Sequence, residues 1–447
     1  MRKLFGTDGI RAIAGEPPLD RKTIYAVGRA LAHQVNGTQT APRVVLGMDT
    51  RESSTWIAAV VAAGLRDGGA RVENAGVITT PGIAHLTQRH RFAAGIVISA
   101  SHNPWQDNGI KVFGSDGYKL PDQIELRIEE EIFRRLDDQQ APEPGDPPAV
   151  NEKYKCEYEE FLRAAVPGLA LNGMRVVLDC ANGAASAIAP ALFAHIGGKA
   201  HLTHVSPNGR NINDGCGALH PSVVAKETKA LGADLGITFD GDADRALFAD
   251  AHGNVVNGDA VMLLAARDMK QRGTLTNSIV VATTMSNMGL EAALRHEGIR
   301  MLRAPVGDKY VLERMQQEDA ALGGEQSGHI LFPHLATTGD GLLTALMVLD
   351  IVRRSGRPLH ELVADLKVYP QVIVNVRVRE KKPLEKIASV ANTIRDAETE
   401  LAESGRVVVR YSGTEALARV MIEAESEDAM RRHADRIAEA IRNELGM

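Results

Sequence analysis

The stretch "RVVLGMD", residues 43–49, followed by "STWIAAVVAAGLRDGG", residues 54–69, decides the fold class. The first segment is a short apolar, β-branched run of the kind found in buried strands. The second has apolar residues at helical spacing and ends in a glycine pair, which favours the end of a helix. The run "AAGIVISAS", residues 93–101, then returns to strand character. This alternation predicts βαβ units built around a parallel sheet.

The same alternation continues after a proline-rich segment, "QQAPEPGDPPAV" at 139–150, which we interpret as a linker. Further strand and helix patterns occupy residues 174–186, 233–250, 278–287 and 291–305. From residue 368 onward, alternating strands are separated from two helical stretches, which favours a small α+β unit. We therefore expect three successive mixed α/β domains of similar topology and a smaller C-terminal α+β domain. The expected domain boundaries are 1–150, 151–253, 254–367 and 368–447.

The composition is that of an ordinary globular protein, with 44% hydrophobic and 24% charged residues among 447. A net charge of −6 argues against a nucleic-acid-binding surface, which would gather Lys and Arg. We find no apolar leader and no long uncharged apolar run, so we expect neither export nor membrane insertion. Three scattered cysteines are too few for a disulfide framework or a zinc site, and they favour a reducing cytoplasm.

A carboxylate-rich loop follows one predicted strand. Asp240, Asp242 and Asp244 stand in "DGDADR" directly after the apolar "LGITF". Three carboxylates so close together repel unless they are solvated or bound to a cation, and oxygen ligands without His or Cys indicate Mg²⁺ or Ca²⁺. An EF-hand is excluded, because its sixth and twelfth positions would be Arg245 and Ala251. A solvated acidic turn and an aspartyl-phosphate enzyme with Asp240 as nucleophile are the alternatives.

Ser101 lies where "VISASHNPWQDNG", residues 97–109, leaves the predicted strand for a turn. A serine hydrolase would show the pattern G-x-S-x-G, which is absent here. Neighbours such as Ser101 and His102 are also not expected to point toward each other. A serine combined with a carboxylate metal loop fits phosphoryl transfer better.

Three further loops carry candidate binding groups. In "GGEQSGH", residues 323–329, glycines flank a carboxylate, a hydroxyl and an imidazole, which suits sugar hydroxyls. In "RYSGTEALAR", residues 410–419, hydroxyls and backbone N–H groups lie between two arginines, which suits a phosphate. "FGTDGIR", residues 5–11, places Arg11 after a glycine-rich turn. Taken singly, each pattern is also compatible with an ordinary surface loop.

Together, and in their order along the chain, these loops resemble those of the α-D-phosphohexomutases over residues 5 to about 423. "VGDKY" at 306–310, Gln326 and "TTGDG" at 337–341 resemble the bacterial members that act on glucosamine phosphates. Ala416 departs from the family, which usually has proline there. The resemblance implies four domains around a central cleft, each of which supplies one loop.

The resemblance also implies residue roles. Ser101 would carry a phosphate, and Mg²⁺ would be held by that phosphate with Asp240, Asp242 and Asp244. The residues around the transferring group would be Arg11, Lys111, Arg245 and His329, with Lys111 and His329 as candidates for general acid and base in either order. Glu325 and Ser327 would hold hexose hydroxyls. The non-reacting phosphate would contact Arg410, Ser412, Gly413, Thr414 and Arg419.

The implied reaction is an isomerisation. Phosphoserine would donate to the 1-hydroxyl of glucosamine 6-phosphate, and the 1,6-bisphosphate would return its 6-phosphate and leave as glucosamine 1-phosphate, a precursor of UDP-N-acetylglucosamine and the cell wall. The same chemistry on mannose or glucose phosphates is one alternative, and a sugar-phosphate binding protein without turnover is the other. Gln326 is our sequence candidate for a modest preference for the amino sugar. The expected partner is the hexosamine phosphate, without nucleic acid or membrane.

Overall fold

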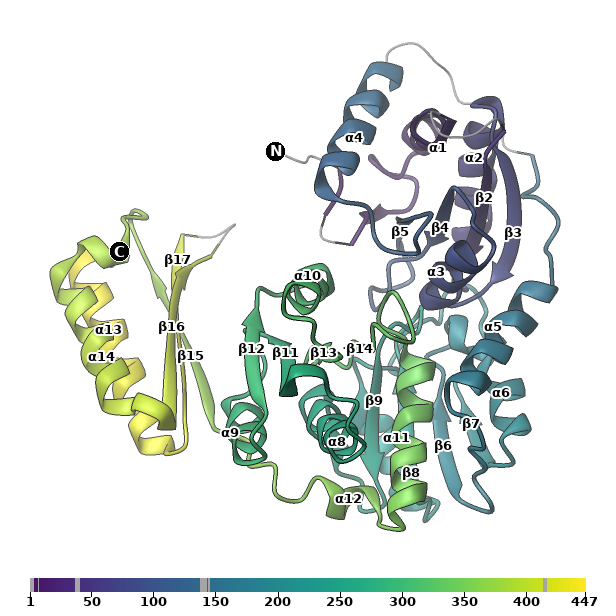
Figure 1. Ribbon diagram of the computed structural model, residues 1–447. Coiled ribbons are helices and arrows are strands. Elements are labelled where there is room, and N and C mark those ends of the chain that lie inside the picture. Colours follow the sequence, from purple (N-terminus) through teal and green to yellow (C-terminus); the bar gives the residue numbers. More distant parts are fainter. Residues whose placement is uncertain (1–3, 7, 37–40, 137–142, 144, 413–415) are drawn as a thin grey trace. The chain divides into compact units, whose positions relative to one another are not determined.

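The computed structural model describes residues 4–6, 8–36, 41–136, 143, 145–412 and 416–447. The chain forms two compact units. One unit contains Met1–Met285 and Met301–Val363, and the other contains Ser286–Arg300 and Ala364–Met447. Figure 1 shows the elements of both.

The first sheet has the strand order β1-β5-β4-β2-β3. Its strands and the surrounding helices are β1 (Ile10–Ile13), α1 (Arg21–Asn36), β2 (Arg43–Met48), α2 (Ser54–Asp67), β3 (Arg71–Val77), α3 (Thr80–Arg89), β4 (Ala94–Ile98), β5 (Asp107–Gly114) and α4 (Asp122–Leu136). The predicted parallel pairing holds for β2 with β3 and β4. Strands β5 and β1 are antiparallel instead. The connection 99–106 is too short for a crossover, so β5 returns as a hairpin.

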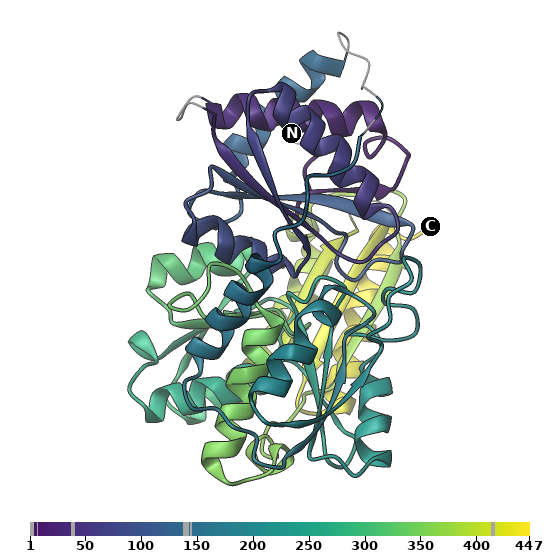
Figure 2. The same ribbon diagram turned by 90° about the vertical axis from the view of Figure 1, so that its right-hand side faces the viewer.

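Strand β4 is buried along its whole length because helices cover both faces of this sheet. Figure 1 shows α1, α2 and α4 on one side and α3 on the other, and Figure 2 shows the purple helices above the sheet. Leu46 and Ile96 belong to the core shared with α1 and α2. The alternate position Gly95 faces α3, where an added Cβ would lie 2.1 Å from Thr87 Oγ1.

The second domain repeats this strand order, and in the described residues the four-stranded third sheet repeats it without the first edge strand. Their sheets have the orders β10-β9-β8-β6-β7 and β12-β11-β13-β14. The elements of the second domain are α5 (Lys153–Ala165), β6 (Arg175–Asp179), α6 (Ala189–His195), β7 (Lys199–Thr203), α7 (Pro221–Ala230), β8 (Leu235–Phe239), β9 (Ala246–Asp250) and β10 (Val255–Val256). Those of the third are α8 (Gly258–Gln271), β11 (Ile279–Thr283), β12 (Arg300–Ala304), α10 (Asp308–Glu318), β13 (Leu322–Gly324), β14 (Ile330–Leu331), α11 (Gly341–Ser355) and α12 (Leu359–Leu362).

The repeated topology gives three candidate loops the same place in their domains. Each loop follows the last parallel strand of its sheet and precedes an antiparallel partner strand. Ser101 lies in the β4–β5 connection, Asp240–Asp244 in the β8–β9 connection, and Glu325–His329 in the β13–β14 connection. Loops at the carboxyl ends of sheet strands are a common place for binding sites in α/β folds.

The other unit is built on an antiparallel sheet of order β15-β17-β16. Its elements are α9 (Met288–His296), β15 (Gln371–Arg377), α13 (Ala388–Leu401), β16 (Gly405–Tyr411), β17 (Leu417–Ala424) and α14 (Glu427–Leu445). Helix α9 joins this unit because Met288 N donates to Glu423 Oε1 (3.1 Å) and Asn287 Nδ2 donates to Tyr369 O (3.0 Å). The smaller α+β domain is thus present as expected.

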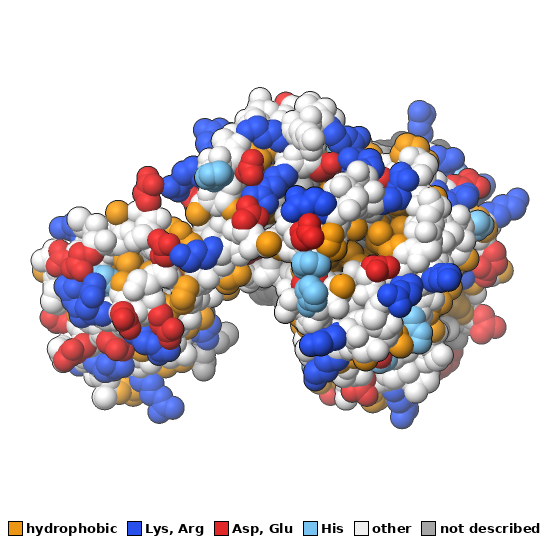
Figure 3. Space-filling model, turned by 90° about the horizontal axis from the view of Figure 1, so that it is seen from below, with side chains coloured by type: hydrophobic (Ala, Val, Ile, Leu, Met, Phe, Trp, Pro, Cys, Tyr) orange, Lys and Arg blue, Asp and Glu red, His pale blue; other side chains and the backbone are white. Residues whose placement is uncertain are grey.

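Charges of both signs are interspersed on the surface of this unit in the view of Figure 3. None of the helices in the described ranges combines the length and the apolar character needed to cross a bilayer.

Candidate active site

Ser101 is buried, with 1% of its surface exposed, at the carboxyl end of β4. Its φ of 55° lies in the left-handed region, which is uncommon for a residue other than glycine. Three hydrogen bonds hold this conformation. Ser101 N donates to Ser99 Oγ (3.0 Å), and Ser101 O accepts from Arg51 Nη2 (2.9 Å) and from Asn213 Nδ2 (3.0 Å). Ser99 and Arg51 belong to the first domain and Asn213 belongs to the second, so both domains position the serine.

Arg51 is a fully buried cation that sequence reasoning missed. Its Nε donates to Asp49 Oδ2 (2.9 Å), and its Nη atoms donate to the carbonyls of Ser101, Asn103 and Pro104. A signal for it was available, because β2 and β4 are parallel neighbours and their carboxyl ends adjoin. Polar residues directly after β2 therefore had to lie beside the Ser101 loop.

For the isomerisation that the resemblance implies, we expect Arg51→Lys to lower kcat more than it changes KM. A lysine ammonium cannot reproduce the planar fork that serves a carboxylate and several carbonyls at once. Each lost charge-assisted hydrogen bond contributes roughly 2 kcal/mol, so the serine would leave its productive position. Steady-state kinetics and urea unfolding give the two readouts. Arg210→Lys is the control, because Arg210 is exposed and pairs with Glu52 (2.6 Å). Equal kcat in Arg51→Lys and wild type would remove Arg51 from the positioning of Ser101.

The three aspartates of the β8–β9 loop form a buried cluster whose carboxylate oxygens lie within 4.8 Å of one another. Asp240 Oδ2 accepts a hydrogen bond from Ser101 Oγ at 2.6 Å. Burial, together with the charges of Asp244 and Asp242, raises the pKa of Asp240 well above its usual value. The serine hydroxyl and the acidic loop are thus in direct contact, although 139 positions separate them in the chain.

Cations from three domains surround this cluster. Lys111 on β5 is buried, with its Nζ 2.8 Å from Asp242 Oδ2, 2.9 Å from Asp8 Oδ2 and 3.4 Å from Asp244 Oδ2. Burial alone would lower the pKa of Lys111, but Asp242 and Asp8 raise it well above its usual value. Lys111 is therefore an ammonium ion in this arrangement.

His329 is also a cation. Its Nδ1 lies 3.5 Å from Asp244 Oδ1 and its Nε2 lies 3.5 Å from Asp308 Oδ2. Burial acts to lower the pKa of His329, but Asp244 and then Asp308 outweigh it and raise the pKa to about 9. Both candidates for acid and base thus carry a proton near neutral pH, which suits them to donate a proton or to stabilise negative charge.

The expectation that Ser101 and His102 point apart is wrong. Ser101 Oγ lies 3.2 Å from His102 Nδ1, because the left-handed turn at Ser101 folds the two side chains together. Arg245 Nη1 lies 3.3 Å from the same nitrogen. Burial, then the charges of Arg245 and Arg11, lower the pKa of His102 to about 4. His102 is therefore neutral.

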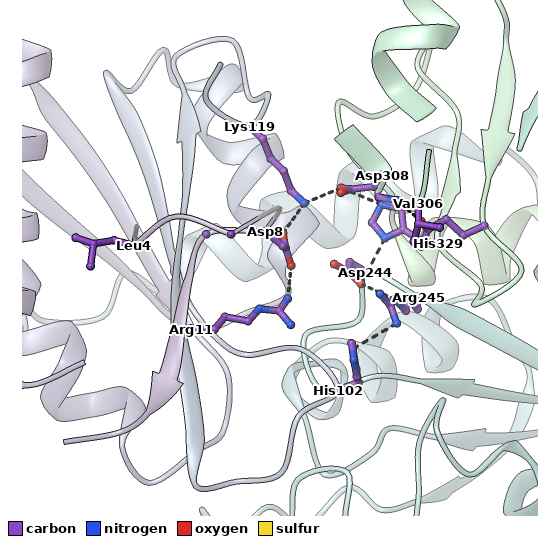
Figure 4. A pocket seen from close by; sticks show the side chains of 14 residues that line it. Leu4, Asp8, Arg11, His102, Lys119, Asp244, Arg245, Val306, Asp308 and His329 are labelled. Atoms are coloured by element: carbon purple, nitrogen blue, oxygen red, sulfur yellow. Dashed lines mark hydrogen bonds and ion pairs between the residues drawn. The ribbon is translucent and has the colours of Figure 1, made fainter. Parts of the chain in front are cut away.

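A cavity of about 370 Å³ opens in front of these groups (Figure 4). Arg11, His102, Asp244, Arg245, Glu325 and His329 line it. Sequence reasoning missed three charged residues of its wall, namely Asp8, Lys119 and Asp308. Asp8 and Asp308 both contact Lys119, so a chain of charges crosses from the first domain to the third. Asp8 and Asp308 stood within the quoted motifs "FGTDGIR" and "VGDKY", whereas Lys119 left no signal in the sequence.

The β13–β14 loop is a tight turn that presents Glu325. Glu325 Oε1 accepts from Gly307 N (3.1 Å) and Oε2 accepts from Ser327 Oγ (3.1 Å). Gly328 has a φ of 93°, and an added Cβ there would lie 2.3 Å from Ala246 O, so this position requires glycine. Gln326 does not line the cavity, because its Nε2 donates to Asp259 Oδ2 (3.1 Å). This contact does not support our suggestion that Gln326 selects the amino sugar, which stays a prediction.

The candidate phosphate loop joins β16 and β17 in the other unit. Arg410 and Arg419 are direct partners across these strands, and Ser412 N donates to Leu417 O (2.8 Å). Like charges at directly opposed strand positions are unfavourable unless an anion compensates them. Gly413 and Thr414 lie outside the described residues. Ala416, the departure from the family pattern, accepts a hydrogen bond from Val378 N (3.0 Å).

The acidic cluster fits a hard divalent cation. Its donor set consists of carboxylate oxygens, the ligand type that such ions prefer. Among the described residues, Asp242 Oδ1 is buried and has no hydrogen-bond partner, and the nearest cation to Asp244 Oδ1 is His329 Nδ1 at 3.5 Å. Such orphaned buried acceptors are rare in folded proteins unless an ion or a water compensates them.

The phosphoglucomutase/phosphomannomutase models match the chain in order: α/β/α domain I over residues 2–139, domain II over 157–253, domain III over 257–369 and the C-terminal domain over 373–440. A protein named phosphoglucosamine mutase from Koribacter versatilis is 60% identical over 100% of this chain and 98% of its own length. One of the same name from Solibacter usitatus is 52% identical over 100% and 99%.

Solved structures of the same fold are more distant in sequence. A phosphoglucomutase/phosphomannomutase family protein from Burkholderia thailandensis has a TM-score of 0.79 at 23% identity and covers 100% of both chains. The N-acetylphosphoglucosamine mutase of Aspergillus fumigatus, in complex with GlcNAc-6P and magnesium, has a TM-score of 0.61 at 19% identity, over 99% of this chain and 96% of that one.

Proposed function

The chain belongs to the phosphoglucomutase/phosphomannomutase family of the phosphohexomutase superfamily, and we propose that it interconverts glucosamine 6-phosphate and glucosamine 1-phosphate. The name that its full-length relatives share supports this substrate. The observation that carries the chemistry is the 2.6 Å contact between Ser101 Oγ and Asp240 of the buried acidic cluster, whose Asp244 lines a cavity together with Arg11, Arg245 and His329.

Ser101 is the phosphate carrier of the proposed reaction. As the bond between phosphorus and Ser101 Oγ breaks, a bond forms to the 1-hydroxyl oxygen, which loses its proton while Oγ gains one. The 1,6-bisphosphate then reorients, and its 6-phosphate returns to Ser101 by the reverse exchange. Arg11, Lys111, Arg245 and His329 stabilise the phosphoryl oxygens. Lys111 or His329 supplies the proton to the leaving oxygen, and the proton that the 1-hydroxyl releases restores the charge of this donor.

The family generally uses a metal ion, and we propose Mg²⁺ as this ion. Asp240, Asp242, Asp244 and the phosphate of Ser101 would hold it. Bound there, the cation would offset negative charge on the transferring phosphoryl group. Glu325 and Ser327 hold hexose hydroxyls, and the loop with Arg410, Ser412, Gly413, Thr414 and Arg419 holds the phosphate that does not react.

We assign one loop to each of four domains, 1–150, 151–253, 254–367 and 368–447. The product would feed synthesis of UDP-N-acetylglucosamine and of cell-wall precursors. The three cysteines are free thiols, which supports the assignment to a reducing cytoplasm. The proposed partner is the hexosamine phosphate alone, without nucleic acid or membrane.

The test is a comparison of kcat/KM for glucosamine, glucose and mannose phosphates, with one preparation of phosphorylated, Mg²⁺-loaded enzyme. We expect glucosamine phosphate to be the best substrate and the other two to react measurably. A better rate with glucose or mannose phosphate would overturn the substrate assignment and leave the chemistry in place. Absence of turnover with all three would favour a binding protein.

A further inference from the structure

One cavity carboxylate, Asp308, has been given no contact with the substrate so far, although it is one of the two carboxylates beside His329. It is the first residue of α10 and lies on the third-domain side of the cavity, with its side chain toward Lys119 and His329 (Figure 4). Because the proposed substrate carries a protonated 2-amino group, a site that prefers it needs an anion at that position. We propose that Asp308 binds the 2-ammonium group and thereby selects hexosamine phosphates over 2-hydroxy hexose phosphates, an inference that rests on the proposed function.

The turn before α10 fixes Asp308 beside the proposed sugar-binding loop. Gly307 adopts φ 127°, a conformation that favours glycine, and its N donates to Glu325 Oε1 at 3.1 Å. Gly307, which precedes Asp308 in the chain, thus connects Asp308 to Glu325 through its hydrogen bond. If Glu325 holds ring hydroxyls, a carboxylate attached this closely reaches the neighbouring ring substituent.

Asp308 is also close to the reacting end of the site. The imidazole of His329 lies between Asp244 and Asp308, at 3.5 Å from each carboxylate. One ring thus separates Asp308 from the acidic cluster that contacts Ser101. The 2-amino group is attached to the carbon next to C1, so its partner must lie near the phosphoryl donor when the 1-hydroxyl reacts.

The cavity has four carboxylates, and since Glu325 is assigned to ring hydroxyls in the proposed function, Asp308 is the one that remains for a new cation. Asp8 contacts Lys111 (2.9 Å), Lys119 and Arg11, and Asp244 belongs to the acidic cluster. Asp308 Oδ2 contacts Lys119 Nζ at 2.6 Å. Because Lys119 also contacts Asp8, it keeps an anionic partner when Asp308 turns to the substrate.

The inference is tested with Asp308→Asn, which keeps the shape of the side chain and removes its charge. An asparagine can still bond a 2-hydroxyl, but it cannot neutralise an ammonium. We expect the ratio of kcat/KM for glucosamine 6-phosphate to that for glucose 6-phosphate to fall about ten- to a hundredfold, the cost of one charge-assisted hydrogen bond. Calorimetric affinities for the same two sugar phosphates should show the same change in ratio.

Glu313→Gln is the matched control, since it removes an exposed carboxylate from the same helix outside this cavity, and its ratio should equal that of wild type. Asp308→Glu, which restores the charge, should recover part of the preference. An equal loss for both sugars in Asp308→Asn would overturn the inference and make Asp308 a support for Lys119. If wild type itself prefers glucose 6-phosphate, the proposed function fails instead, so the two failures are distinguishable.

Discussion

Ser101→Ala is expected to abolish the interconversion of the hexosamine phosphates and to leave the fold intact. The hydroxyl is the proposed phosphate carrier, and no other group replaces its oxygen in both transfers. Its loss removes the 2.6 Å hydrogen bond to Asp240 but no packing volume beyond one oxygen. The backbone at φ 55° costs an alanine about as much as a serine, so the free energy of unfolding should fall only by the cost of leaving the buried Asp240 oxygen without its donor, about 1–3 kcal/mol.

Two measurements check this prediction. A coupled assay for glucosamine 1-phosphate should detect no turnover, and intact mass after incubation with a hexose bisphosphate should show no added phosphate. Ser115→Ala is the control, because Ser115 is exposed in the same domain and the substitution removes the same hydroxyl. If Ser101→Ala turned over at the wild-type rate, the alternative with Asp240 as the phosphorylated nucleophile would become the leading mechanism.

The sequence predicted best those helices and strands whose local residue pattern indicates the same structure as their burial in the fold. The helix expected to stop at the glycine pair ends at Asp67, and Gly68 N donates to Gly64 O (3.0 Å). The acidic loop and the strands on both sides of it also lie as expected, because an apolar run on either side of polar residues specifies strand, loop and strand.

What the sequence left out depends on contacts between distant segments. Lys119 lies between Asp8 and Asp308, which are 111 and 189 positions away along the chain. No local pattern encodes such a pairing, since it arises only when the first and third domains pack together. The same holds for Arg51, because its hydrogen bond to Ser101 O depends on the pairing of β2 with β4. The contact of Gln326 also escaped the sequence, because its partner Asp259 lies on another element.

Asp242→Asn is expected to weaken Mg²⁺ binding by at least about a hundredfold and to lower kcat by orders of magnitude. Changes to mere neighbours of metal ligands already cost 10–100-fold in metal affinity, and here an anionic oxygen of the proposed ligand set is lost. Asp242 Oδ1 is buried without a hydrogen-bond partner, so it is the atom best placed to bind a cation.

The substitution keeps the size of the side chain, which limits its effect on Lys111 and Thr80, the two residues that contact Asp242 Oδ2. Calorimetric titration with Mg²⁺ measures the affinity, and Asp214→Asn is the control, because Asp214 is an exposed aspartate of the same domain. Affinity in Asp242→Asn equal to that of the control would make the β8–β9 loop an ordinary acidic turn. Phosphoryl transfer at Ser101, which contacts Asp240 at 2.6 Å, would then have to proceed without a cation bound by this loop.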